Sequence, residues 1–190
     1  MDNMDISWNP FVLSHVIDLV LHNQVKVPLY AFADTRVPAN SPQWQQLVNA
    51  DESHARSFDP NMHRRHLPTV CYNCHGLSLA SRRGWLNFAD LVLNQENYKE
   101  LARDTEEILP GDLVGYYEHS EIEGMSLSHT GVVTKVDTGS TTKDVYNGLK
   151  SCRVNSKWGM NGEFIHEVIK SPYCSAGYDI KFYRFIRTHY

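Results

Sequence analysis

The 190-residue sequence lacks the features that mark several specialised classes of protein. Four cysteines are too few for a disulfide scaffold, and 11 glycines and 8 prolines exclude a collagen-like or low-complexity chain. No apolar run approaches the roughly 20 residues of a membrane-spanning helix. A net charge of −4 leaves no broad basic face for phosphates. We therefore expect one globular domain that binds neither nucleic acid nor membranes.

The first five residues also lack the positively charged segment that opens a signal peptide. The residues that follow Met1, as far as Asp5, are Asp, Asn, Met and Asp, with no Lys or Arg. We therefore expect a chain that is made in the cytoplasm. It either stays there or is exported by a specialised secretion system.

The N-terminal half is expected to be helical and irregular. Residues 8–24 and 88–101 place apolar side chains at helical spacing, as does the segment that follows Cys74. Residues 25–70 contain repeated X-Pro steps, which disfavour helix, so they predict an irregular stretch with one short helix at 44–48.

Every apolar run after the Pro-Gly turn at 110–111 has the pattern of a strand. These runs cover residues 113–117, 130–136, 145–146, 152–158, 164–169 and 180–186. Helices followed by antiparallel strands indicate an α+β domain rather than a doubly wound sheet. We expect residues 1–69 to form an N-terminal helix and an irregular segment that wraps the core of residues 70–190.

The string Cys71-Tyr72-Asn73-Cys74-His75 has several interpretations. It matches the CxxCH pattern of c-type haem attachment. With His63 and His66 it also offers four zinc ligands, although the two pairs lie closer together than in usual zinc sites. A further interpretation is a pair of buried thiols without chemical function.

Another interpretation makes Cys74 a nucleophile that opens a helix. Asn73 is a good N-cap, and the backbone N–H groups of a helix start favour a thiolate. A nucleophilic cysteine needs a histidine base and a third polar group, both brought close by the fold. The best candidate for the base is His129, in Ser-His-Thr-Gly-Val-Val at the start of a predicted strand.

Three segments together resemble the NlpC-type cell-wall cysteine peptidases and amidases. They are Cys-His-Gly-Leu at 74–77, Leu-Pro-Gly-Asp-Leu-Val at 109–114 and the His129 string at 128–133, and the resemblance covers residues 70–190. It implies a papain-like domain in which the Cys74 helix packs on an antiparallel sheet. It also implies amide hydrolysis in peptidoglycan peptides, or in a related γ-glutamyl or isopeptide substrate, without a metal or organic cofactor. Asn73 stands where the family commonly has aspartate.

The third catalytic residue has two candidate positions. His166 ends the string Gly-Glu-Phe-Ile-His, which resembles the family's common ending. Alternatively, the string Val-Asn-Ser-Lys-Trp-Gly at 154–159 is the strand beside His129, and Asn155 or Ser156 faces the catalytic ring. We favour His166, because an imidazole can span the gap.

The remaining expectations concern substrate and partners. Tyr72 and Trp158 are expected to wall the substrate cleft. The alternatives to a hydrolase are a haem or zinc protein and a catalytically inactive binding module on the same fold. A glycosidase pair among Glu118, Glu121 and Glu123 lacks an aromatic platform for sugar. An immunity or delivery protein is an expected partner if the chain is an exported effector.

Overall fold

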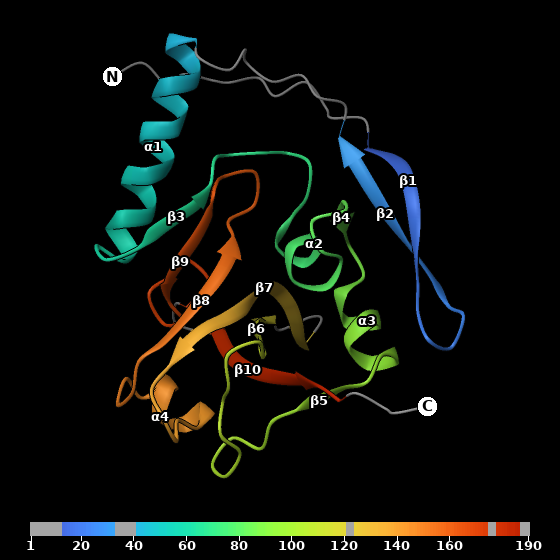
Figure 1. Cartoon of the computed structure of the whole chain (residues 1–190), viewed down its shortest axis with the longest axis vertical. Coiled ribbons are helices and arrows are strands. Elements are labelled where there is room, and N and C mark those ends of the chain that lie inside the picture. Colours follow the sequence, from blue (N-terminus) through green and yellow to red (C-terminus); the bar gives the residue numbers. More distant parts are fainter. Residues whose placement is uncertain (1–12, 33–40, 121–123, 175–177, 187–190) are drawn as a thin grey trace.

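The computed structural model describes residues 13–32, 41–120, 124–174 and 178–186, which form two antiparallel sheets and four helices (Figure 1). The strands are β1 (Leu13–Val20), β2 (Lys26–Phe32), β3 (His63–His66), β4 (Trp85–Leu86), β5 (Tyr98–Glu100), β6 (Leu113–Ser120), β7 (Gly124–Val136), β8 (Cys152–Lys157), β9 (Glu163–Glu167) and β10 (Tyr178–Phe185). The helices are α1 (Pro42–Phe58), α2 (Cys74–Leu79), α3 (Ala89–Gln95) and α4 (Thr142–Tyr146). Within these described ranges, no helix is both long and apolar enough to cross a membrane.

The larger sheet has the strand order β3-β9-β8-β7-β6-β10-β5, with every neighbouring pair antiparallel. All strands after the turn at 110–111 lie in this sheet, so the predicted antiparallel sheet is confirmed. Side chains alternate between its faces along β6, as the pleat requires. Val114 and Tyr116 join the core cluster that includes Val145 of α4, whereas Leu113 and Tyr117 join a cluster with α3.

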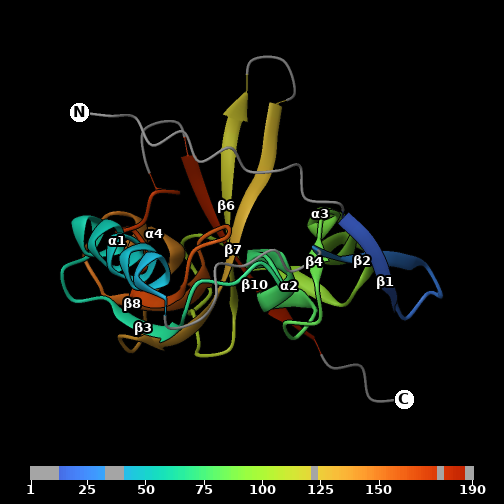
Figure 2. The same cartoon turned by 90° about the horizontal axis from the view of Figure 1, so that it is seen from above.

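The helix predicted for residues 8–24 is wrong over its described part, because Leu13–Val20 is strand β1. It pairs with β2 in a three-stranded sheet of order β1-β2-β4, which lies at one end of the molecule (Figures 1 and 2). Val16, Ile17 and Val20 are β-branched, which favours a strand, and Gln24 takes the positive φ of 67° that the connecting turn needs. Residues 8–12 lie outside the described residues.

Three other expectations differ from the structure. The stretch expected to be irregular contains β2 and a 17-residue helix α1, which the side chain of Ser41 caps, in place of a short helix at 44–48. The helix predicted at 88–101 ends at Gln95 and is followed by β5. Residues 145–146 end helix α4 and are not a strand. Strands therefore also precede the helices, although the class remains mixed α and β.

Candidate active site

Cys74 is the first residue of α2, and its neighbour Asn73 fixes the start of that helix. The Asn73 Oδ1 atom accepts the N–H groups of Gly76 at 2.8 Å and Leu86 at 3.1 Å, and its Nδ2 donates to the Leu86 carbonyl at 3.0 Å. Asn73 therefore caps α2 and ties it to β4. Glycine is required at position 76, because a Cβ there would lie 1.8 Å from the carbonyl oxygen of Gly84.

The Cys74 thiol is buried where α2 meets the main sheet. The backbone of Thr130, the residue after His129, lowers the pKa of this thiol, and the Thr130 hydroxyl lies 3.0 Å from Nδ1 of His75, the next residue of α2. Burial raises the pKa of the Cys74 thiol to about 11, which outweighs the lowering by the Thr130 N–H and by the charge of Lys157. The expected thiolate is therefore not the resting form in this closed arrangement. The thiol must lose its proton to a base before it can attack.

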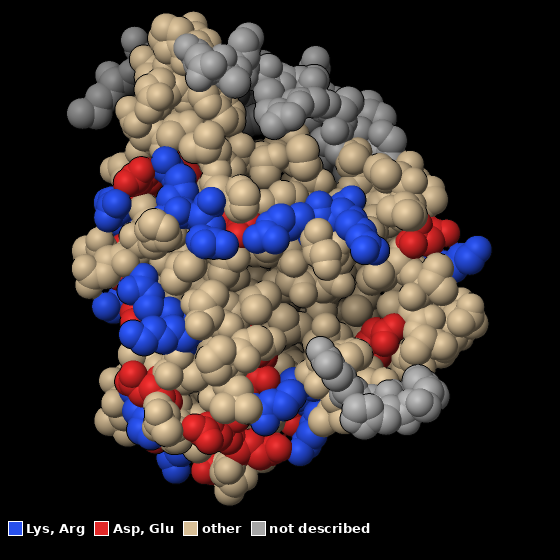
Figure 3. Space-filling model, viewed as in Figure 1, with Lys and Arg blue, Asp and Glu red and all other residues tan. Residues whose placement is uncertain are grey.

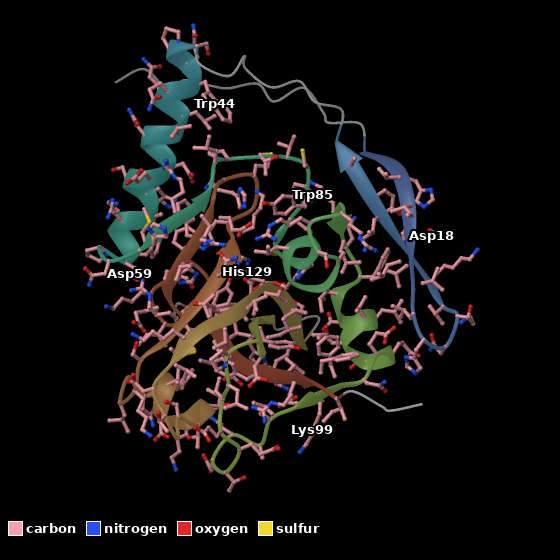
Figure 4. All side chains as sticks on the ribbon, viewed as in Figure 1. Asp18, Trp44, Asp59, Trp85, Lys99 and His129 are labelled. Carbon is pink, nitrogen blue, oxygen red and sulfur yellow. The ribbon has the colours of Figure 1, made fainter. Side chains whose placement is uncertain are left out.

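His129 lies within β7 near the centre of the molecule (Figure 4), rather than at the start of a strand as expected. The β6–β7 register shifts beside it, so that Ser128 is an extra residue in the ladder. Such bulges redirect the neighbouring side chains. The ring is fully buried, neither of its nitrogens has a hydrogen-bond partner among the described residues, and Tyr173 stacks on it with centroids 3.6 Å apart. Burial holds the pKa of His129 well below its usual value, so the ring is a neutral base.

The three candidates for the third residue do not bond to the His129 ring. His166 Nδ1 donates to the Glu167 carbonyl at 2.8 Å, and its Nε2 accepts from Ser156 Oγ at 2.8 Å. The Asn155 side-chain amide donates to the Glu163 carboxylate at 2.7 Å. Trp158, expected to wall a cleft, is 2% exposed and donates its indole N–H to Ser156 at 3.0 Å. It is a packing residue in this arrangement.

Sequence reasoning missed an ion pair between a buried carboxylate and the more exposed Arg82, which holds the segment before α2. Glu163 is fully buried and binds the Arg82 guanidinium through Nη2 at 2.6 Å and Nε at 3.0 Å. Its carboxylate also accepts from the Tyr72 hydroxyl at 3.0 Å and the Asn155 amide at 2.7 Å. Burial alone would raise the pKa of Glu163, but these hydrogen bonds outweigh it and lower the pKa. Tyr72 is thus anchored through its hydroxyl.

No family model, curated protein or solved structure matches this chain. The chemistry of the site therefore rests on the residues and contacts described above.

The metal interpretations find little support in the geometry. No group of three or more His, Cys, Asp or Glu side chains in the described segments is arranged to hold a metal ion, so His63 and His66 do not join the cysteine pair. Haem attachment would need both sulfurs and His75 to face one porphyrin. Cys71 is exposed, whereas Cys74 is buried and His75 Nδ1 lies 3.0 Å from the buried Thr130 hydroxyl.

Of the carboxylates in the glycosidase alternative, only Glu118 is among the described residues. Glu118 is an exposed residue of β6 and lies opposite Tyr178 of β10. Glu121 and Glu123 lie outside the described residues.

Replacing Arg82 should show how much the Arg82–Glu163 ion pair contributes to the stability of the fold. Arg82→Met leaves the Glu163 carboxylate buried without its cation, and we expect the free energy of unfolding to fall by about 3 kcal/mol. Urea denaturation at pH 7 measures this change. Arg83→Met is the matched control, because Arg83 is an exposed neighbour and its loss should cost less than about 0.5 kcal/mol. Equal stability of the two variants would contradict this role.

Proposed function

We propose that the chain is a thiol-dependent hydrolase, a cysteine peptidase or amidase with a papain-like domain of NlpC type over residues 70–190. The observation that carries the proposal is the packing of α2 on β7, in which His75 Nδ1 lies 3.0 Å from the Thr130 hydroxyl. It brings a cysteine that opens a helix against the strand residue next to His129. A neutral imidazole can take a thiol proton, but burial lowers the pKa of His129 and raises that of Cys74, so the site must open to substrate or water before this transfer is favourable.

The reaction follows the general course of nucleophilic acyl transfer. His129 takes the Cys74 proton, and the thiolate attacks the amide carbonyl to give a tetrahedral oxyanion. Backbone N–H groups at the start of α2 supply part of its stabilisation. The carbon–nitrogen bond then breaks, the amine leaves with the proton from His129, and water hydrolyses the thioester. Tyr173 stacks on one face of the His129 ring, which fixes the plane in which the ring nitrogens can take a proton.

His166 is retained as the third member of the proposed site, although its ring currently binds Ser156. The two rings lie in one sheet, in which β8 separates β7 from β9, and a proton on His166 would lower the pKa of His129. The orienting role requires the His166 ring to exchange Ser156 for His129 when the site opens. Asn155 and Ser156 are the competing candidates for this role.

The proposed substrate is a peptide of peptidoglycan or a related γ-glutamyl or isopeptide amide. Lys and Arg side chains form a row across the face that carries β3 and α2 (Figure 3), which supports substrates with free carboxylates. Recycling of wall peptides in the cytoplasm and delivery as an exported effector both use this chemistry. In the second case an immunity or delivery protein is the proposed partner.

A substrate panel tests the proposal. The purified chain is incubated with short peptides that contain α-peptide, γ-glutamyl or side-chain isopeptide amides, and released amine is quantified by mass spectrometry. We expect release from at least one class and its loss after treatment with iodoacetamide. Release that survives complete alkylation of Cys74, or no release from any class, would contradict a thiol-dependent hydrolase.

A further inference from the structure

The His129 ring has no hydrogen bond that would set its direction. Neither ring nitrogen has a partner among the described residues, although the side chain is fully buried. The last torsion of a histidine side chain has broad energy minima, so the position of the backbone alone does not fix the plane of the ring. A base that exchanges a proton with a neighbouring group needs that plane to be held. A contact other than a hydrogen bond must therefore hold it.

Two tyrosine rings contact the His129 imidazole. Tyr173 lies parallel to it, with 8° between the ring planes and 3.6 Å between the centroids. Tyr116 packs against it with a centroid distance of 5.4 Å and a tilt of 54°. A parallel ring at van der Waals distance leaves no room for the edge of the imidazole to turn toward it. The stack with Tyr173 is therefore the contact that defines the plane of the ring.

Tyr173 is itself held by the aromatic rings around it. It follows β9 in a turn that the Cys174 N–H closes by donating to the Ser171 carbonyl at 3.1 Å. The centroid of its ring lies 6.1 Å from that of Tyr116 in β6 and 6.5 Å from that of Trp158, the residue after β8. The side chain packs against two clusters of buried apolar residues through these contacts. A ring that is restrained in this way can restrain its neighbour.

We propose that Tyr173 is a positioning residue for His129, and that its stacked ring holds the imidazole in the plane in which it takes and returns the Cys74 proton. The proton transfer rests on the proposed function, whereas the restraint on the ring can be measured in the free protein. The stack does not distinguish the two edges of the imidazole, so a polar orienter such as His166 keeps that role. Tyr173 acts only through His129.

The first measurement compares kcat and KM on the substrate found in the peptide panel. Tyr173→Leu removes the ring but keeps an apolar side chain. We expect kcat to fall about 10- to 100-fold and KM to stay within about two-fold of wild type, because the ring plane affects proton transfer and not binding. Tyr173→Phe restores the stacked ring and should stay within about three-fold of wild type.

Tyr178→Leu is the matched control. Tyr178 is also a half-buried tyrosine that packs against the core cluster of Val114 and Tyr116. It belongs to β10, which β6 separates from the His129 strand β7. Its replacement removes the same atoms from the same cluster and should keep kcat within about two-fold of wild type.

The second measurement is proton NMR of the free protein, in which the ring signals of His129 are assigned by their loss in His129→Gln. Protons over the face of an aromatic ring are shifted upfield by its ring current. We expect the His129 signals to move downfield and to broaden in Tyr173→Leu, as the imidazole samples other planes. They should stay in place in Tyr173→Phe and Tyr178→Leu.

Four results would overturn the proposal. They are a wild-type kcat in Tyr173→Leu, an equal loss in Tyr178→Leu, a loss in Tyr173→Phe as large as in Tyr173→Leu, and His129 signals that do not change in Tyr173→Leu. The second would show a general loosening of the core, and the third would move the effect to the hydroxyl. If Tyr173→Leu does not fold, Tyr173→Met replaces it under the same criteria, since methionine fills the space without a planar ring.

The outcome is separable from the proposed function. If the wild-type chain cleaves no peptide, the hydrolase is contradicted and the NMR measurement decides on Tyr173. A change of the His129 signals that is confined to Tyr173→Leu then supports the restraint, and unchanged signals overturn it. If peptides are cleaved and Tyr173→Leu keeps the wild-type kcat, the hydrolase is supported and the assignment of Tyr173 is overturned.

Discussion

Cys74→Ala should reduce amide hydrolysis by about 10⁴-fold or more, whereas Cys71→Ala should stay within about two-fold of wild type. The two cysteines belong to one short string, but only Cys74 opens α2 and is buried, whereas Cys71 is exposed. Alanine at position 74 removes the atom that forms the covalent bond, so no remaining group replaces it. Initial rates of amine release measure both variants on the substrate found in the peptide panel.

The comparison is informative because both variants should keep the fold. Removal of the Cys74 sulfur from a small buried site costs about 1 kcal/mol, and Cys71 is exposed. Thermal unfolding of each variant checks this point. Loss of activity in both, or in Cys71→Ala alone, would move the chemistry away from the Cys74 sulfur.

The second large effect concerns acid stability, because three histidines are buried as neutral rings. Burial lowers the pKa of His75 and of His166 to about 4, and it lowers that of His129 well below its usual value. In the unfolded chain each ring binds a proton below about pH 6.5. The unfolded state therefore takes up more protons, and stability falls as the pH drops from 6.5 toward 4.

Each ring should cost about 2 kcal/mol between pH 7 and pH 5, and the three together about 5 to 6 kcal/mol. This is a large share of the ~5–15 kcal/mol that stabilises a typical domain. We expect urea unfolding to show this loss, with acid unfolding beginning near pH 5.

Single replacements measure how much each buried histidine contributes to the loss of stability at low pH. His75→Gln and His166→Gln should each flatten the dependence of unfolding free energy on pH by about 1.4 kcal/mol per unit between pH 5 and 6. His119→Gln, at an exposed position of β6, should leave the slope as it is. A wild-type free energy of unfolding that is constant from pH 7 to pH 5 would contradict neutral burial of the three rings.

The parts of the fold that could be predicted have strong local signals. The strands from β6 onward follow from alternating apolar residues between turns, and the start of α2 follows from the capping residue Asn73. The hairpin of β1 and β2 was missed because Val16 and Val20 satisfy both a helical spacing and a strand propensity. Helix α1 was predicted only as a short helix at 44–48, because prolines on both sides suggested loop, whereas Pro42 occupies its first turn.

In the site, as in the fold, residues in a local sequence string could be predicted, whereas contacts between distant residues could not. Cys74 and His129 belong to recognisable strings, and the packing of α2 on β7 brings the residue after His129 to the start of α2. No local pattern links Arg82 to Glu163, which are 81 residues apart, and none places Tyr173 on the His129 ring. The position of Cys74 at a helix start also did not predict that its pKa is raised rather than lowered. It depends on how completely the sheet buries the sulfur.

The most direct test of the account is to trap the acyl-enzyme. The protein is mixed with a cleaved peptide, quenched in acid within the first turnover, and mapped by mass spectrometry. The account predicts a mass increase equal to the acyl part of the substrate, on the peptide that contains Cys74, and no such adduct in Cys74→Ala. An adduct on another residue, or amide cleavage at the wild-type rate by Cys74→Ala, would contradict the account.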